Sequence, residues 1–314
     1  TRQFVDLESD FISAFSKIGR SGSYILGPEV EQFEEAIADY CGVKHAIGVG
    51  DGSAALFLPL KALGIGDGDE VVTAANSFIA SAWVIAAAGA TPVLTDVSDD
   101  LNMCATSLVS AISPRTRAIM PVHLAGRPAD MDVITSIATE AGIPIIEDAA
   151  QAIGARYNGK QVGSLGLAAG FSLHPLKNLG VYGDGGFITT NDDALADRVR
   201  LLRNHGLKSR DDCLVWGYNS RLDSIQAAFA LIKLKHLPIW NQRCREIAER
   251  YRRGLEGFVK VPKEQSNVEN VYHNFIIETP HRDALAKHLK GEGIGTAIHY
   301  PVPIHLQKAA KHLG

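Results

Sequence analysis

A lysine in an unusual setting is the first residue with evident chemical potential. Lys177 follows an apolar run at 169–173 and precedes the glycine-rich turn Gly183-Asp184-Gly185-Gly186, with no obvious solvated face around it. Most lysines in proteins are exposed. Partial burial would lower the pKa of this amine, and a neutral amine can attack a carbonyl carbon. Lys177 is therefore a candidate for a Schiff-base lysine.

A second candidate is an acid at the end of a buried run. Ile145-Ile146-Glu147 leads directly into Asp148, and Gln151 follows three residues later. Open α/β sheets bind ligands at the carboxyl ends of their strands, which is where Asp148 would lie. Capping of a following helix explains the same aspartate equally well.

A third candidate is a glycine-rich turn that could hold a phosphate. Residues 48–55 read Gly-Val-Gly-Asp-Gly-Ser-Ala-Ala, between a strand pattern and a helix pattern. Backbone N–H groups at a helix start attract anions. Gly50, Gly52 and Ala55 also fit the loose dinucleotide pattern G-x-G-x-x-A, but Glu70 begins the next strand, where that pattern needs an acid at the strand's end. The alternative interpretation, a tight turn that binds no ligand, remains open.

The last polar cluster precedes a helix pattern. Residues 216–223 read Trp-Gly-Tyr-Asn-Ser-Arg-Leu-Asp. Polar side chains in such a place usually cap the helix, so capping and a functional role are equally open here.

Alternating strand and helix patterns must position these candidates. Between strand patterns lie helix patterns at 53–63, 77–88 and 131–141. Most strand patterns are continuously apolar, as in strands covered on both faces. This rhythm predicts an α/β fold with an open, mostly parallel sheet wrapped by helices. The predicted strands are 45–50, 70–74, 91–96, 117–122, 144–147, 169–173 and 186–189.

Further elements flank this sheet. Residues 28–39 predict a helix before it, and residues 223–237 and 239–255 predict two helices after it, broken at Pro238. A strand at 271–278, a helix at 282–291 and a strand at 295–299 then suit a small α/β lobe. We therefore expect a large domain at 1–237 and a smaller C-terminal lobe at 238–314, which looks incomplete.

Composition sets the outer limits. The chain has 314 residues and a net charge of −4, which provides no general attraction to nucleic acid or anionic membranes. Its four cysteines lie far apart and form no C-x-x-C pair, so we expect neither a metal site nor a disulfide framework. No apolar run reaches the roughly 18 residues of a membrane span, and the first ten residues show no signal-peptide pattern. The expectation is a cytoplasmic protein.

Three motifs in this order resemble a known family. They are Glu147-Asp148-Ala149-Ala150-Gln151, His174-Pro175-Leu176-Lys177-Asn178 and Asn219-Ser220-Arg221. Together they resemble the DegT/StrS-type sugar aminotransferases, which are pyridoxal-phosphate (PLP) enzymes of fold type I. The resemblance runs from Ser23-Tyr24-Ile25-Leu26-Gly27-Pro28 to the stretch 299–305. It implies a large PLP-binding domain with a smaller C-terminal lobe.

The resemblance also implies roles around the PLP ring. Lys177 would hold PLP as a Schiff base and move the proton during transfer. Asp148 would pair with the pyridine nitrogen and keep it protonated, so that the ring withdraws electrons. Gln151 would hydrogen-bond the ring hydroxyl. Phe78 would stack on the ring, with a core phenylalanine as the alternative.

The phosphate and the subunit arrangement follow from the same resemblance. Gly52, Ser53 and Ser172 would hold the phosphate, although Asp51 adds a negative charge beside it. Asn219 would reach the phosphate of a neighbouring subunit, since the family shares its active sites across a homodimer.

The implied reaction moves an amino group from L-glutamate to a nucleotide-linked keto sugar. The segments 177–186 and 219–223 resemble the enzymes that act on 3-keto sugars more than those that act on 4-keto sugars. Arg221 is a candidate contact for phosphate or substrate. Tyr24, His299 and Tyr300 are substrate-side candidates by position only.

Three alternatives remain. Dehydratases of the same fold replace the lysine with histidine, which the presence of Lys177 disfavours. A non-catalytic regulator has no need for both Lys177 and Asp148. A nicotinamide-dependent dehydrogenase has only the loose glycine pattern in its favour.

Overall fold

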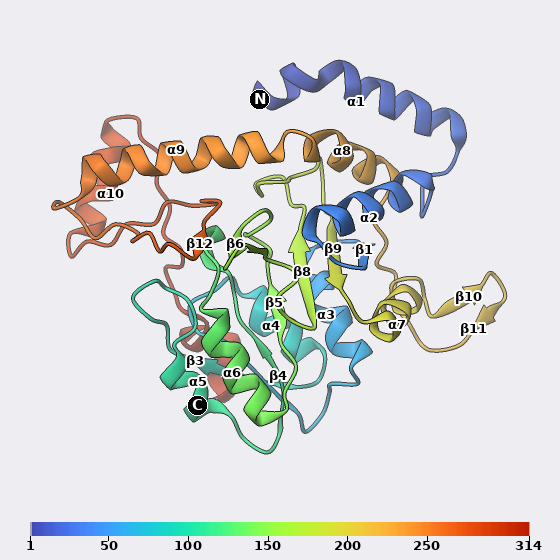
Figure 1. Cartoon of the computed structure of the whole chain (residues 1–314), viewed down its shortest axis with the longest axis horizontal. Coiled ribbons are helices and arrows are strands. Elements are labelled where there is room, and N and C mark those ends of the chain that lie inside the picture. Colours follow the sequence, from blue (N-terminus) through green and yellow to red (C-terminus); the bar gives the residue numbers. More distant parts are fainter. Residues whose placement is uncertain (1, 314) are drawn as a thin grey trace.

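A seven-stranded sheet forms the centre of the computed structural model, which describes residues 2–313 (Figure 1). One half has the strand order β1, β9, β8, β5, and the other half the order β3, β2, β4. Parallel bridges between Ile119 and Ile145 and between Val122 and Asp148 join β4 to β5. Among these strands β9 alone runs antiparallel to its neighbours, which confirms the mostly parallel sheet. The strands are β1 (His45–Val49), β2 (Glu70–Ala74), β3 (Thr91–Thr95), β4 (Thr116–Met120), β5 (Ile146–Asp148), β8 (Ala168–Ser172) and β9 (Gly186–Thr190).

Helices cover both faces of this sheet, as the buried apolar strands require. Phe33 and Phe187 pack with ring centroids 5.6 Å apart, and Phe171 stacks on Phe187 at 4.5 Å, so one core lies between α2 and the sheet. The covering helices are α2 (Pro28–Cys41), α3 (Gly52–Ala62), α4 (Ala80–Ala87), α5 (Ala105–Ala111), α6 (Met131–Ala141), α7 (Asp193–Arg203) and α8 (Ser224–Leu234).

The first helix was not among the expected elements. Helix α1 (Arg2–Ser21) buries Leu7, Phe11 and Ile18, a spacing typical of one helix face. The Phe11 ring packs against Phe229 of α8 at 5.1 Å, and α1 lies along the top of Figure 1. Packing of its apolar face against α8 therefore stabilises this helix.

The predicted break at Pro238 was misplaced. Helix α8 ends at Leu234, and α9 (Leu237–Leu255) begins before the proline, which lies in its first turn. Proline is well tolerated there because the first N–H groups of a helix have no partner inside it. The interruption falls at Lys235 and His236 instead.

The predicted strands at 271–278 and 295–299 were wrong for the part of the chain that is described. The region holds α10 (Arg282–Gly291), as expected, but only a single bridge between Lys260 and Glu278. A strand requires a neighbouring row of backbone partners, and the described residues provide this region with isolated contacts only. The ends of the two expected domains, Thr1 and Gly314, lie outside the described residues.

Small hairpins and turns complete the chain. Strands β6 (Arg156–Tyr157), β7 (Lys160–Gln161) and β12 (Val268–Glu269) form one small sheet. The hairpin of β10 (Leu207–Ser209) and β11 (Asp212–Cys213) projects from the body in Figure 1. Short 3-10 turns lie at Leu124–Gly126, Ile304–Leu306 and Lys308–Leu313.

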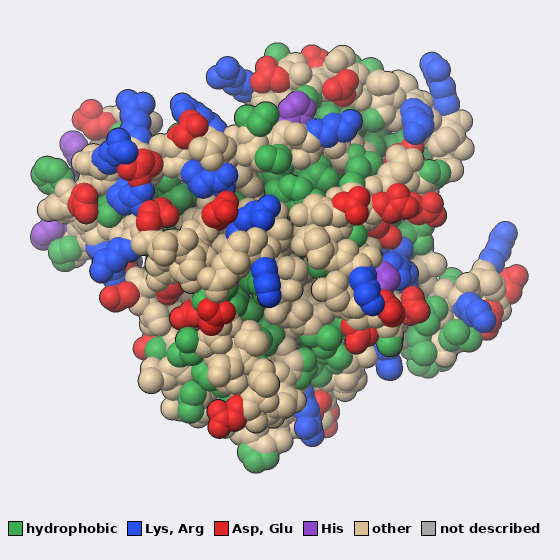
Figure 2. Space-filling view, viewed as in Figure 1, with side chains coloured by type: hydrophobic (Ala, Val, Ile, Leu, Met, Phe, Trp, Pro, Cys, Tyr) green, Lys and Arg blue, Asp and Glu red, His purple; other side chains and the backbone are tan. Residues whose placement is uncertain are grey.

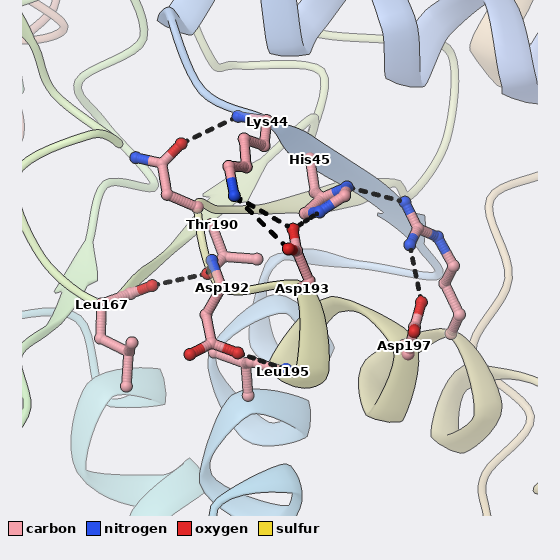
Figure 3. A network of polar contacts seen from close by, with 10 residues as sticks. Lys44, His45, Leu167, Thr190, Asp192, Asp193, Leu195 and Asp197 are labelled. Atoms are coloured by element: carbon pink, nitrogen blue, oxygen red, sulfur yellow. Dashed lines mark hydrogen bonds and ion pairs between the residues drawn. The ribbon is translucent and has the colours of Figure 1, made fainter.

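A polar network fixes the start of β1 against α7 (Figure 3). The Nζ of Lys44 and the Nε2 of His45 lie 3.4 Å and 2.8 Å from the Asp193 carboxylate, in the first turn of α7. The neighbouring Asp192 accepts a hydrogen bond from the Leu195 N–H at 2.7 Å and so caps the same helix. This edge of the sheet is held by side chains as well as by strand pairing.

Candidate active site

The carboxyl ends of two central strands meet the start of a helix. Asp148 is the last residue of β5, Ser172 is the last residue of β8, and Gly52 is the first residue of α3. This is the sheet edge at which open α/β proteins bind ligands. Three of the predicted site residues thus come from three separate elements.

The start of α3 is arranged to bind an anion. The Asp51 carboxylate accepts a hydrogen bond from the Ala54 N–H at 2.8 Å, and the Ala55 N–H donates to the Asp51 carbonyl at 3.1 Å. Within residues 2–313, the N–H groups of Gly52 and Ser53 have no such partner. They point out of a helix N-terminus, where partial positive charge collects. The charge of Asp51, which the sequence left unexplained, serves as the helix cap.

Position 52 requires glycine because Ser172 of β8 lies directly against it. A Cβ on Gly52 would lie 2.6 Å from the Cβ of Ser172. The two backbones can approach this closely only because Gly52 has no side chain. The Ser172 hydroxyl is thereby placed beside the start of α3, which joins the predicted phosphate ligands Gly52, Ser53 and Ser172 in one cradle.

Asp148 is buried without a cationic partner. Its carboxylate accepts hydrogen bonds from the Ser81 hydroxyl at 2.7 Å and from the Ala150 N–H at 3.2 Å. Among the described residues, no lysine, arginine or histidine nitrogen reaches it within ion-pair distance. Burial raises the pKa of Asp148, while the bonds from Ser81 and Ala150 and the charge of Lys177 act in the opposite direction. A positively charged N–H donor in the site would satisfy this carboxylate.

Lys177 lies half-buried in the same electrostatic environment. Burial lowers the pKa of its amine, and the charge of Asp148 acts against that shift. The Lys177 N–H donates to the His174 carbonyl at 2.8 Å, so the lysine sits on a tight turn after β8. The direction of this shift favours the neutral amine that Schiff-base formation requires.

Gln151 connects the site to the C-terminal segment. Its Oε1 accepts a hydrogen bond from the Ala125 N–H at 2.7 Å, and its Nε2 donates to the Tyr300 hydroxyl at 3.3 Å. The rings of Tyr300 and Phe78 lie 6.2 Å apart. Phe78 is 54% exposed, so the alternative of a core phenylalanine was wrong. Tyr300 therefore contacts both Gln151 and the exposed ring of Phe78.

Sequence reasoning missed two residues of this region. Ser81, on α4, holds the Asp148 carboxylate and lies 2.8 Å from the Ser77 hydroxyl. His273 has its pKa lowered to about 4, first by burial and then by the charges of Lys177 and His299. Nothing in the local sequence marks either residue, because only tertiary packing brings α4 and the 271–274 segment to the site. His299 also belongs to this environment.

The side-chain hydrogen bonds of Tyr24 and Arg221, and the backbone bridge of Asn219, involve residues outside this centre. Tyr24 is exposed, and its hydroxyl donates to the Gly19 carbonyl at 3.3 Å. Asn219 is exposed, and its backbone forms an isolated antiparallel β-bridge with Asn204. The Arg221 Nη1 donates to the Asn204 Oδ1 at 3.0 Å. No hydrogen bond in the described chain joins any of these three to Lys177, Asp148 or Gln151.

The acid before Asp148 has a structural role. Glu147 is fully buried and accepts hydrogen bonds from the N–H groups of Gly163, Leu165 and Gly166 at 2.8–2.9 Å. The Nδ1 of His123 accepts from the Ala129 N–H at 3.0 Å, so its Nε2 carries the proton and donates to Glu147, also at 3.0 Å. This pair fixes the turn that leads into β8.

The described residues contain no cluster of three or more potential metal-ligating side chains. Between residues 2 and 313, no helix combines the length and apolar character needed to span a bilayer.

Comparison with known proteins extends these observations. The model of the DegT/DnrJ/EryC1/StrS aminotransferase family matches residues 5–314. A "dTDP-3-amino-3,4,6-trideoxy-alpha-D-glucose transaminase" from Streptomyces venezuelae is 45% identical, over 98% of this chain and 82% of its own. A "Pleiotropic regulatory protein" from Geobacillus stearothermophilus is 46% identical, over 100% of this chain and 86% of its own.

A solved structure shows the same fold. The crystal structure of S. venezuelae DesV in complex with a ketimine intermediate matches with a TM-score of 0.97 and 44% identity, over 99% of this chain and 85% of that one. Its agreement confirms the expected fold type. With its family model, its relatives and its site geometry in accord, this chain belongs to the DegT/DnrJ/EryC1/StrS aminotransferase family.

Proposed function

We propose that this protein is a PLP-dependent aminotransferase that transfers an amino group to a nucleotide-linked 3-keto sugar. One observation carries the proposal: a buried carboxylate without a cationic partner, Asp148, shares its environment with the half-buried amine of Lys177. The relative from S. venezuelae is named for a 3-amino sugar, which supports the 3-keto class of substrate. Solved structures of similar chains include PLP and pyridoxamine-phosphate forms.

The residues present fit pyridoxal phosphate. Its phosphate matches the free N–H groups of Gly52 and Ser53 and the hydroxyl of Ser172 beside them. Its pyridinium N–H is the kind of cationic donor that Asp148 lacks. Its ring hydroxyl can accept from the Gln151 Nε2. When bound, the cofactor supplies a reactive aldehyde carbon and a ring that withdraws electrons from the carbon bearing the amine.

Each protein group then has a defined task. Lys177 provides the amine that holds the cofactor, and its lowered pKa lets it accept and return a proton at the reacting carbon of the substrate. Asp148 holds a proton on the pyridine nitrogen, and Ser81 fixes the orientation of that carboxylate. Phe78, whose ring lies 6.2 Å from that of Tyr300, would stack on the cofactor ring.

We infer that L-glutamate is the amino donor and that the protein works as a homodimer. Asn219 is exposed and makes no hydrogen bond to Lys177 in the described chain, which supports its proposed role toward the phosphate of a neighbouring subunit. Exposed apolar side chains support a second copy as the partner. On α1 these are Val5, Ile12 and Phe15, and beside the projecting hairpin Trp216 is 94% exposed. Figure 2 shows hydrophobic side chains gathered on this hairpin.

Regulation without catalysis is the second candidate, because one relative at 46% identity is named a pleiotropic regulatory protein. The presence of both Lys177 and Asp148 favours the enzyme. A cytoplasmic location and the division into domains 1–237 and 238–314 stay predictions.

The visible absorption spectrum tests the proposal. Adding pyridoxal phosphate to the purified protein should produce a yellow band, and L-glutamate should then bleach it to the pyridoxamine form. The Lys177→Ala variant should fold but form no such band and lose turnover by several orders of magnitude. A band that ignores every amino donor, or near-normal turnover in Lys177→Ala, would contradict the proposal.

A further inference from the structure

Three polar side chains hold the segment that follows Lys177. Gln226 pairs with the backbone of Tyr182 in both directions: the Tyr182 N–H donates to its Oε1 at 3.1 Å, and its Nε2 donates to the Tyr182 carbonyl at 3.0 Å. The Nζ of Lys233 donates to the Gly180 carbonyl at 2.5 Å. The Nδ2 of Asn178 donates to the Oδ1 of Asn241 at 2.9 Å.

These contacts follow a regular spacing. Gln226 and Lys233 stand seven residues apart on α8, which is about two helical turns, and Asn241 follows eight residues later on α9. Their partners are residues 182, 180 and 178, every second residue of the segment. Helices α8 and α9 run one after the other across the upper part of Figure 1. The two helices therefore hold alternate residues of 178–182, immediately beyond Lys177.

The central contact is an unusual use of a lysine. Lys233 is 4% exposed, burial lowers its pKa, and none of the acids in the described chain lies within ion-pair distance of it. Its ammonium group lies 4.5 Å from the centre of the Tyr182 ring, on the same segment. Burying a cation without an acid costs free energy that an apolar side chain of similar length would not cost. Its hydrogen bond to Gly180 and its contact with the Tyr182 ring both involve the segment after Lys177, which indicates that Lys233 holds that segment.

The third contact also reaches the other side of the site. The Nδ2 of Asn241 donates to the Ile153 carbonyl at 3.0 Å, two residues after Gln151. A Cβ on Gly154 would lie 2.6 Å from that same Nδ2, so the asparagine fits closely against this turn. Asn241, itself 2% exposed, thus connects the segment after Lys177 with the segment after Asp148.

We propose that Gln226, Lys233 and Asn241 are positioning residues that fix the segment 178–182 and thereby the orientation of the Lys177 amine relative to Asp148. This inference rests on the proposed role of Lys177. The three residues act on the site through the backbone and through Asn178, and they do not touch the reacting atoms.

The test compares Lys233→Met with Lys235→Met. Lys235 is exposed, lies two residues further on, and loses the same charge in its variant. In the protein without cofactor, Lys233→Met should speed hydrogen exchange of the 174–184 segment about tenfold, the effect of losing one buried hydrogen bond. With pyridoxal phosphate, the pH midpoint of the visible band should move and kcat should fall with little change in KM. Lys235→Met should match the wild type in exchange rate, pH midpoint and kcat. Lys233→Arg should restore most of the wild-type value of each of these quantities.

The opposite pattern overturns the inference. It fails if Lys233→Met lowers the melting temperature yet leaves both the exchange of 174–184 and the pH midpoint at wild-type values. Gln226→Leu, at a partly exposed position, provides the same readouts if Lys233→Met does not fold. The exchange measurement needs no cofactor. If the wild type forms no visible band, the proposed function fails while exchange still decides whether α8 and α9 anchor this segment.

Discussion

At the scale of single residues, the buried carboxylate of Asp148 makes a sharp prediction. In Asp148→Asn the amide oxygen can accept from the Ala150 N–H while Nδ2 donates to the Ser81 hydroxyl, and the variant carries no charge for burial to disfavour, so the melting temperature should not fall. The rate should drop about 10²- to 10³-fold, the loss typical of removing one electrostatic partner of a reacting group. Measured kcat and thermal unfolding check this. An unfolded variant would instead assign Asp148 a structural role.

His273 predicts a pH dependence of stability at the same scale. Its pKa in the folded protein is about 4, below the ordinary value of 6.5, so protons bind preferentially to the unfolded chain between these values. The contribution of His273 to the free energy of unfolding is fully present above pH 6.5. It decreases as the pH falls toward 4, by at most about 3 kcal/mol. Urea unfolding of His273→Gln should show a flatter profile than the wild type. The exposed His281→Gln variant should keep the wild-type slope, and equal slopes for all three would contradict the prediction.

At the scale of elements, the start of α3 depends on its contact with β8. In Gly52→Ala the new Cβ would meet the Cβ of Ser172 at 2.6 Å, so the helix start must move away from the strand end. We expect pyridoxal phosphate to bind at least about tenfold more weakly, because about 1.4 kcal/mol of misplaced phosphate contacts suffices for that. Absorbance titration measures the dissociation constant.

Gly254→Ala is the matched control for this change. Gly254 lies near the end of α9, and a Cβ there has open space around it. This substitution should leave cofactor binding unchanged and stabilise the protein by about 0.5–1 kcal/mol. Equal affinities in Gly52→Ala and Gly254→Ala would remove the α3 start from the proposed phosphate site.

At the scale of the whole molecule, the exposed apolar face of α1 predicts how subunits associate. The double variant Ile12→Lys and Phe15→Lys should weaken the homodimer about 100-fold, since exposed apolar anchors of this size dominate interfaces. Activity should fall with it, because Asn219 would serve the neighbouring subunit. Sedimentation across a range of protein concentrations gives the association state.

Phe258→Lys is the control for association, since Phe258 is 85% exposed but lies outside α1 and the hairpin. It should sediment like the wild type. A wild type that stays monomeric while fully active would contradict the shared site.

Much of the molecule could be read from the sequence. The strands around the site were predicted within a few residues, because continuously apolar runs are typical of strands covered on both faces. Lys177, Asp148 and Gln151 stood out because motifs of charged and polar residues directly follow such runs. The polar network that α8 and α9 direct at residues 178–182 left no local signal.

What the sequence alone determined was the order of the central strands with the helices between them, and the family, since both depend on local patterns and short motifs. Tertiary structure decided which distant residues meet: Ser81 against Asp148, His273 beside Lys177, and Lys233 on the Gly180 carbonyl. It also decided that 271–278 forms no full strand, because pairing depends on a neighbour that local pattern cannot supply. Burial, and with it the pKa shifts of Asp148 and Lys177, arises only once these segments pack together.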